Sequence, residues 1–212
     1  LRALPRRWQV AGLAGLLLLL LVPLLQNASP YAVVLMIDVL IAVLFATSLH
    51  FVMGPAGLHS FGHAAYFGLG AYGAALCIKA WGLPMEAALL LAPLAALLGA
   101  LLCGWLCVRL SGVYLAMLTL AFAQIVWAVV FQWDGFTGGS NGLVGIWPAP
   151  WLAPKPALYL VTLGCTVAGC TLLARLLHAP LGLALRAGRD SAVRSAAIGK
   201  PYLEVLHADL ER

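Results

Sequence analysis

Two histidines and a serine stand close together in an apolar part of the sequence. His59 and His63 are four residues apart, a spacing that places two metal ligands on one face of a helix. Ser60 and His63 are the residue types of a nucleophile and its general base. A metal site needs more ligands than these, and a hydrolytic triad needs an orienting carboxylate, for which Asp38 is the sole candidate. The residue types therefore favour a structural histidine motif over a metal site or an enzymatic centre.

The stretch around these histidines is also rich in small residues. From Gly57 to Leu76 it reads GLHSFGHAAYFGLGAYGAAL. Several glycines and alanines, such as Gly70 and Ala74, are four apart, the spacing that lets helix backbones approach closely in lipid. We assign four residues of this stretch to helix packing or to a translocation path: Ser60, His63, Gly68 and Gly70.

Polar residues interrupt a second apolar segment, from Val113 to Gln132. Two interpretations stay open for them: hydrogen bonds to a neighbouring helix, or a surface along the path of a polar solute. Asp38 also has two open interpretations, a structural pairing and a functional role. A carboxylate inside an apolar span costs about 2.5–3.5 kcal/mol on membrane insertion, so such a residue usually faces a bundle interior or a water-filled cavity. The interrupting residues are Tyr114, Thr119 and Gln124.

The composition places these residues in a membrane. The 212-residue chain is 64% hydrophobic and 9% charged, with a mean hydropathy of +1.02, whereas soluble proteins are about half apolar. Its five cysteines all lie in apolar stretches, where they act as small packing residues rather than as a disulfide framework. A net charge of +5 here reflects membrane orientation, and we expect no nucleic-acid partner.

We predict six membrane spans, because one crossing requires roughly 20 apolar residues. The segments between spans carry turn chemistry, such as the run Gly82–Pro84. Ten Lys and Arg residues fall on one side of this arrangement and only Lys79 and Lys155 on the other, so both ends of the chain are expected in the cytoplasm. The glycines of the third span also allow a broken or re-entrant segment. The expected fold is an all-α, polytopic transmembrane helix bundle with spans at 10–25, 31–53, 61–81, 85–108, 113–132 and 157–177.

The segment that follows the last span differs from the rest of the chain. Residues 1–178 form the predicted membrane domain, and residues 179–212 carry arginines set among alanine and leucine. Such a segment can form short helices with an apolar and a basic side. It would serve either as an interfacial helix attracted to anionic membrane lipid or as a docking element for a cytoplasmic partner protein.

Four motifs in order resemble one family, the LivM-type permeases of branched-chain amino acid ABC transporters. They are GLHSFGHAAYFGLGAY (Gly57–Tyr72), RLSGVYLAMLTLAFAQIVW (Arg109–Trp127), WDGFTGGSNGL (Trp133–Leu143) and GLALRAGRDSAVRSAAIG (Gly182–Gly199). The resemblance covers about Tyr31 to Gly199.

This resemblance implies a multi-pass subunit of the bacterial inner membrane that is not an enzyme and binds no cofactor of its own. It would pair with a second, homologous permease subunit, two ATP-binding subunits that use the ATP, and a periplasmic solute-binding protein. By the same resemblance, Arg186, Arg189, Asp190, Arg194 and Gly199 belong to an ATPase-coupling segment, and Thr137, Gly138 and Gly139 to an outer-loop motif.

The expected solutes are branched-chain amino acids. Transport of urea or short-chain amides is the alternative within the same class of permease, and an intramembrane enzyme is an alternative of another class. The family continues past the coupling segment with further membrane helices, whereas this chain ends in KPYLEVLHADLER without an apolar run of spanning length. A C-terminally shortened permease is therefore expected, as a fragment, a frameshifted product or a split protein.

Overall fold

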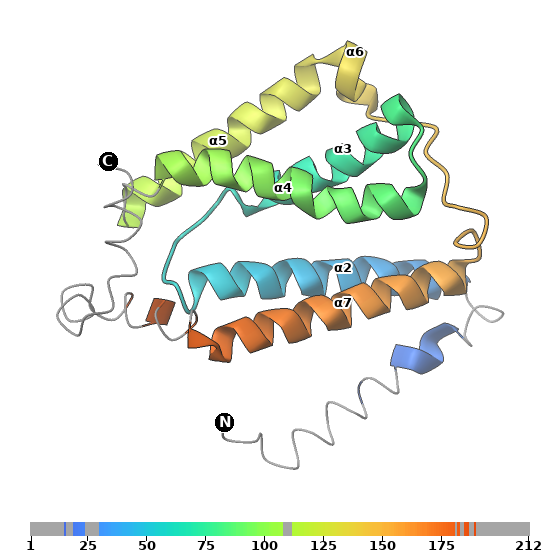
Figure 1. The fold of residues 1–212 in the computed structure, drawn as a ribbon, viewed down its shortest axis with the longest axis horizontal. Helices are drawn as coiled ribbons and strands as arrows, with labels where there is room; N and C mark the ends of the chain where they lie inside the picture. The colour runs from blue at the N-terminus through green and yellow to red at the C-terminus, as the bar shows by residue number, and fades with distance from the viewer. Residues whose placement is uncertain are drawn as a thin grey trace. The chain divides into compact units, whose positions relative to one another are not determined.

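The computed structural model describes residues 15, 19–23, 30–107, 112–180, 182, 185, 186 and 189. Every regular element in that part of the chain is a helix, which confirms the all-α prediction (Figure 1). The elements are α2 (Pro30–Met53), α3 (His63–Trp81), α4 (Met85–Cys107), α5 (Gly112–Gln132), α6 (Asp134–Thr137), the 3₁₀ helix η2 (Gly139–Asn141) and α7 (Lys155–His178).

Four of the described helices are long and apolar enough to cross a membrane. They are Tyr31–Met53 within α2, then α4, α5 and α7, with 21 to 24 residues each. At 1.5 Å per residue they measure about 32–36 Å, enough for a hydrocarbon core of about 30 Å. These four lie close to four predicted spans. α3 has 19 residues and is not among them, and most of the predicted span 10–25 lies outside the described residues, so the six-span topology stays a prediction.

The chain divides into two compact units, of which the first combines residues 1–46 with 150–172. Its core joins Val33 and Leu40 of α2 to Tyr159 and Leu163 of α7. Tyr159 is fully buried, and its hydroxyl donates to the carbonyl oxygen of Leu19 at 2.8 Å. Each of the two helices thus buries one apolar face against the other, and its remaining apolar face is left uncovered.

The second unit combines residues 47–149 with 173–212. Here α3 and α4 form a hairpin, which the short turn Gly82–Pro84 makes possible. Gly82 adopts φ 62°, and its N–H donates to the carbonyl oxygen of Ile78 at 3.1 Å. A residue in this left-handed conformation commonly ends a helix, and glycine does so without a Cβ penalty.

Small residues let α3 and α4 pack closely. A Cβ added to Gly73 would overlap the Cβ of Ala95, and one added to Gly70 would lie 3.3 Å from the carbonyl oxygen of Ala92. In return, Leu69 of α3 fills the space beside Gly99 of α4. The two helices therefore interdigitate through their small residues, as helices in lipid commonly do.

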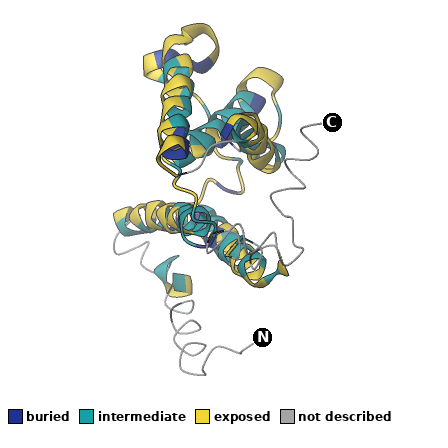
Figure 2. Ribbon diagram, turned by 90° about the vertical axis from the view of Figure 1, so that its left-hand side faces the viewer, coloured by how far each residue is buried: buried dark blue, intermediate teal, exposed yellow. Residues whose placement is uncertain are grey.

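Many large apolar side chains of the described residues remain exposed. Figure 2 shows exposed positions along much of each long helix and buried positions at only a few places. In α4, for example, Leu90 is 77% and Leu102 is 70% exposed. Apolar helix faces of this extent require lipid or other protein helices around them.

Candidate functional site

The loop between α2 and α3, residues 54–62, makes polar contacts with two distant segments of the second unit. Below we call it the α2–α3 loop. The Gly54 N–H donates to the carbonyl oxygen of His50 at 2.8 Å, and Pro55 follows, so α2 ends here. Gly57 then adopts φ +67°, a conformation that other residues rarely take. The sequence Gly-Pro-Ala-Gly therefore produces a turn of irregular backbone instead of a longer helix.

One hydrogen bond ties the two helices that flank this loop. The hydroxyl oxygen of Ser48 in α2 lies 2.7 Å from Nε2 of His63, the first residue of α3. Both side chains are half-buried. The sequence offers Ser60 as a neighbour of His63 and favours a structural role for the histidine; in the structure a serine from the preceding helix lies at the ring.

A second contact ties the loop to α5. The Phe61 N–H donates to the hydroxyl oxygen of Thr119 at 3.1 Å, and that hydroxyl donates to the carbonyl oxygen of Ala116 at 2.9 Å. Thr119 is only 4% exposed. A Cβ at Gly62 would lie 2.7 Å from the carbonyl oxygen of Thr119, so Gly62 allows the loop backbone to lie directly on α5. Since α5 begins at Gly112, this contact is about 10 Å along the helix from its first residue.

A third contact joins the loop to the segment after α7. Nη1 of Arg189 donates to the carbonyl oxygen of Gly54 at 2.7 Å. The side-chain stem of Arg189 lies across Gly57, where an added Cβ would come within 2.5 Å of Cγ and 2.9 Å of Cδ. Gly57 thus serves two purposes, because it supplies the left-handed turn and leaves room for the arginine stem.

The outer-loop residues form a compact cap at the end of α5. The Thr137 hydroxyl lies 2.5 Å from the carbonyl oxygen of Val130 and 2.8 Å from that of Trp133, so it ties the turn to the end of α5. Gly138 and Gly139 have φ values of +77° and +51°. A Cβ at Gly139 would overlap the carboxylate of Asp134. The Thr-Gly-Gly run therefore has a structural explanation in this turn.

Other predicted site residues are not brought together. Tyr114 and Gln124 are exposed on α5, whereas Thr119 is buried, and their spacing puts both well away from the Thr119 face. Gly68 has no neighbouring atom that a Cβ would meet within 4 Å. Of the predicted coupling residues, Arg186 and Arg189 are described, while Asp190, Arg194 and Gly199 lie outside the described residues.

Sequence reasoning missed Ser48, His50 and Gly54. All three lie at the end of α2 or just after it. A polar signal was present, because Thr47, Ser48 and His50 interrupt an apolar helix within its last two turns. The partners of Ser48 and Gly54 lie 15 and 135 residues away in sequence, and no local pattern identifies such pairs.

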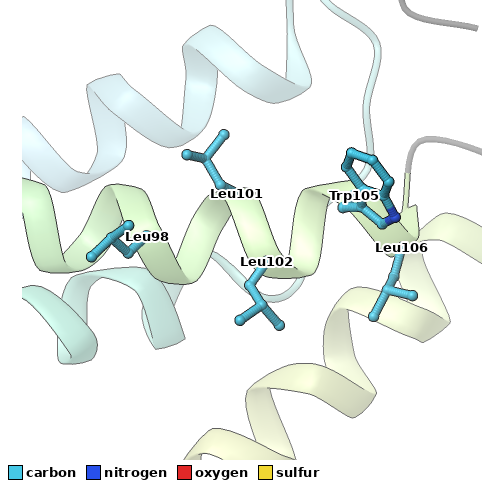
Figure 3. Close-up of a pocket in the computed structure, with 5 residues that line it drawn as sticks. All are labelled: Leu98, Leu101, Leu102, Trp105 and Leu106. Carbon is cyan, nitrogen blue, oxygen red and sulfur yellow. The ribbon is translucent and has the colours of Figure 1, made fainter. Parts of the chain in front are cut away.

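A recess of a different chemical character is lined by residues of α4 alone. Leu98, Leu101, Leu102, Trp105 and Leu106 border an open hollow of about 480 Å³, and Figure 3 shows these side chains along a single helix. No charged side chain lines the hollow. It has the chemistry of a surface that faces acyl chains or another apolar helix, and it offers no group that would select a solute.

The described residues hold no group of three His, Cys, Asp or Glu side chains that could bind a metal ion. The five cysteines are all free thiols. Asp38, the acidic residue considered for catalysis, is exposed on α2, on the side of the helix away from Leu40. The polar contacts of the site hold the α2–α3 loop against α5 and against Arg189. Together with the four apolar helices, they define the class of the protein as a helical membrane protein whose α2–α3 loop is fixed by side-chain hydrogen bonds.

Comparison with known proteins identifies the family. Residues 31–205 match the model of the branched-chain amino acid transport system permease component, and the chain belongs to this family. It is 31% identical over 188 residues to the high-affinity branched-chain amino acid transport system permease protein LivM of Escherichia coli (strain K12). It is 29% identical over 194 residues to the LivM protein of Salmonella typhimurium (strain LT2).

These matches cover 76% of this chain and 44% of each relative. The chain thus spans less than half the length of the curated relatives that it matches. No solved structure matches it significantly. The relatives are transport permeases, and the predicted resemblance to LivM-type permeases is confirmed.

Proposed function

We propose that this chain is a permease subunit of an ABC importer and forms part of the inner-membrane translocation pathway for branched-chain amino acids. The proposal is supported by the family match over residues 31–205 and by the names of both curated relatives. Its partners would be a second homologous permease, two ATP-binding subunits and a periplasmic solute-binding protein. ATP would be hydrolysed by the partners, and the permease itself would carry out no covalent chemistry.

The observation that carries the coupling part of this proposal is the contact of Arg189 with Gly54 and Gly57. Arg189 belongs to the segment after α7 where an ATPase would dock. Thr119 ties the α2–α3 loop to α5, and the Ser48–His63 bond joins the two helices that flank the loop. A displacement of the docking segment by nucleotide binding would therefore displace the loop and bias the helices between two arrangements.

The proposed topology has six spans with both ends in the cytoplasm. In this orientation the α2–α3 loop and Arg189 face the cytoplasm, and the Thr137–Gly139 turn faces the periplasm. This agrees with the excess of Lys and Arg predicted for the cytoplasmic side.

The test is uptake of radiolabelled leucine into cells that lack their own branched-chain permeases and express this chain with the ABC subunits encoded beside it. We expect leucine uptake that competes with isoleucine and valine. Deletion of Arg186–Gly199 should abolish uptake and the co-purification of the ATPase, while the chain still inserts into the membrane. Arg175→Ala, which removes a cation from the last turn of α7, is the matched control and should retain uptake.

Three outcomes would contradict the proposal. Uptake of urea or a short-chain amide without leucine uptake would show that the solute is not a branched-chain amino acid. An assembled complex that transports neither solute would remove the transport function. Retention of the ATPase by the deletion variant would remove the coupling segment from the proposal.

A further inference from the structure

An apolar loop follows the turn at the end of α5. Residues 142–149, which we call the apolar loop, read GLVGIWPA and have no regular secondary structure. Residues 135–154, which include it, contain no charged side chain. Two large side chains of the apolar loop are strongly exposed, Val144 at 71% and Trp147 at 82%. Bulk water would leave both side chains without the burial that favours apolar groups.

Both ends of the apolar loop are attached to the ends of apolar helices. Just before the loop, the Thr137 hydroxyl binds the carbonyl oxygens of Val130 and Trp133. At the end of the loop, the Ala149 N–H donates to Sδ of Met85, the first residue of α4, at 3.4 Å (Figure 1). α4 and α5 follow each other in the chain and are both long enough to cross a membrane, so the start of α4 and the end of α5 lie on one side. The loop therefore runs between two helix ends at the level of the lipid headgroups.

The backbone of the apolar loop determines how deep it can lie. Gly142 and Gly145 have φ values of +66° and +88°. The backbone of residues 143–148 forms no hydrogen bond with the part of the chain that the structure describes. Unpaired backbone groups are not tolerated in the hydrocarbon core, whereas water and lipid headgroups satisfy them. The headgroup layer is thus the surrounding that suits both this backbone and the exposed apolar side chains.

The side chains at this end of α5 favour lipid over a protein partner. Trp133 and Phe136 are 56% and 48% exposed, and their ring centroids are 5.0 Å apart. Tryptophan gathers at the membrane–water interface, because its ring is apolar and its indole N–H binds water. A protein partner is selected by charged and polar groups as well as by apolar ones, and the apolar loop has no charged side chain to offer.

We propose that the apolar loop is an interfacial segment that inserts Val144 and Trp147 among the lipid headgroups beside the ends of α4 and α5. The indole ring of Trp147 lies near the glycerol groups, Val144 contacts the first acyl carbons, and the irregular backbone binds headgroups and water. The loop thereby fixes the depth of two helix ends in the bilayer. This inference depends on the membrane location and does not require that the chain transport any particular solute.

The test is fluorine NMR of the purified full chain, labelled with fluorotryptophan and placed in lipid nanodiscs. Trp147→Phe assigns the Trp147 signal, and Trp127→Phe assigns a reference within α5, about 8 Å from the last residue of that helix. Two paramagnetic probes are compared, a phospholipid with a nitroxide at the top of its acyl chain and a water-soluble gadolinium chelate. We expect the lipid probe to remove the signals of Trp147 and Trp127, and the chelate to broaden both less than the lipid probe does.

A charge placed in the apolar loop should reverse the response of Trp147. Charged side chains avoid acyl chains, so Val144→Asp should raise the loop toward water. The Trp147 signal should then become more sensitive to the gadolinium chelate and less sensitive to the lipid probe. Asn141→Asp adds the same charge to the exposed turn before the loop and should leave the response of Trp147 unchanged.

The remaining outcomes each overturn the proposal. Loss of the Trp147 signal with the chelate, without an effect of the lipid probe, would place the loop in water. Protection from the chelate that arises only when the periplasmic solute-binding protein is added would assign the loop to a protein interface. A Trp147 signal that neither probe affects would bury the loop between copies of the chain, and an unchanged response in Val144→Asp would show that Val144 is not inserted. Because the probes do not measure transport, failure here is distinguishable from failure of the proposed function.

Discussion

At the scale of single residues, two polar side chains hold the backbone of the α2–α3 loop in place, and a pair of polar side chains joins the helices on either side of it. Thr119 accepts from Phe61, Ser48 pairs with His63, and Arg189 donates to the loop carbonyl of Gly54. An irregular loop that reaches into a membrane bundle needs such partners, because lipid offers no hydrogen bonds to its backbone. The positions of Thr119 and Arg189 are thus explained by the loop backbone that they bind.

Thr119 allows this explanation to be tested with two substitutions of opposite character. Thr119→Val keeps the size of the side chain and removes the acceptor of the Phe61 N–H, whereas Thr119→Ser keeps the hydroxyl and removes a methyl group. One lost hydrogen bond costs about 1 kcal/mol, so Thr119→Val should raise the exchange rate of the Phe61 amide roughly fivefold. The measurement is hydrogen exchange of the loop peptide by mass spectrometry. Faster exchange in Thr119→Ser than in Thr119→Val would contradict the assignment.

At the scale of elements, the interface between α3 and α4 depends on where each glycine lies. Gly73 is in direct contact with Ala95, whereas Gly68 on the same helix has open space beside it. The sequence pattern of small residues four apart does not distinguish these two positions. The packing of α3 against α4 distinguishes them, because Gly73 lies on the face of α3 that contacts α4 and Gly68 does not.

The same substitution at these two glycines should have opposite effects. Gly73→Ala forces overlap with Ala95, and overpacking of this kind costs about 1–3 kcal/mol, more than the gain of up to about 1 kcal/mol in helix propensity. Gly68→Ala should gain only the propensity term. We expect the thermal midpoint of the purified subunit to fall with Gly73→Ala and to stay or rise with Gly68→Ala. A lower midpoint for Gly68→Ala alone would show that α3 packs through its other face.

Some features of the elements could be predicted from the sequence and others could not. The bounds of α2, α4, α5 and α7 follow from apolar length and from turn residues, since a span needs about 20 apolar residues. The pairing of Ser48 with His63, and that of Arg189 with the loop, depends on how distant segments pack. Tyr114, Thr119 and Gln124 are five residues apart along the helix and therefore point in different directions, so the sequence alone does not say which of them faces a neighbouring helix.

At the scale of the whole molecule, the second unit constrains how many times the chain crosses the membrane. Residues at the end of α2 and residues after α7 line one pocket, so these two points lie on the same side. Between them come α3, α4, α5 and α7. A return to the same side requires an even number of crossings, and the three apolar helices among these four give an odd number. We therefore predict that α3, which is not among the four helices that are apolar enough to span by themselves, crosses the membrane completely.

Labelling of single cysteines measures this crossing directly. His59 precedes α3 and Trp81 ends it, and both side chains are exposed. If α3 crosses, a membrane-impermeant maleimide should label Trp81→Cys in intact spheroplasts and His59→Cys only after permeabilisation. Ser140→Cys, in the exposed turn after α6, is the control for the periplasmic side, and the unsubstituted chain is the control for its own five cysteines. Labelling of Trp81→Cys and His59→Cys from one side would make α3 re-entrant, and the pocket at the ends of α2 and α7 would then require another helix to complete the even number.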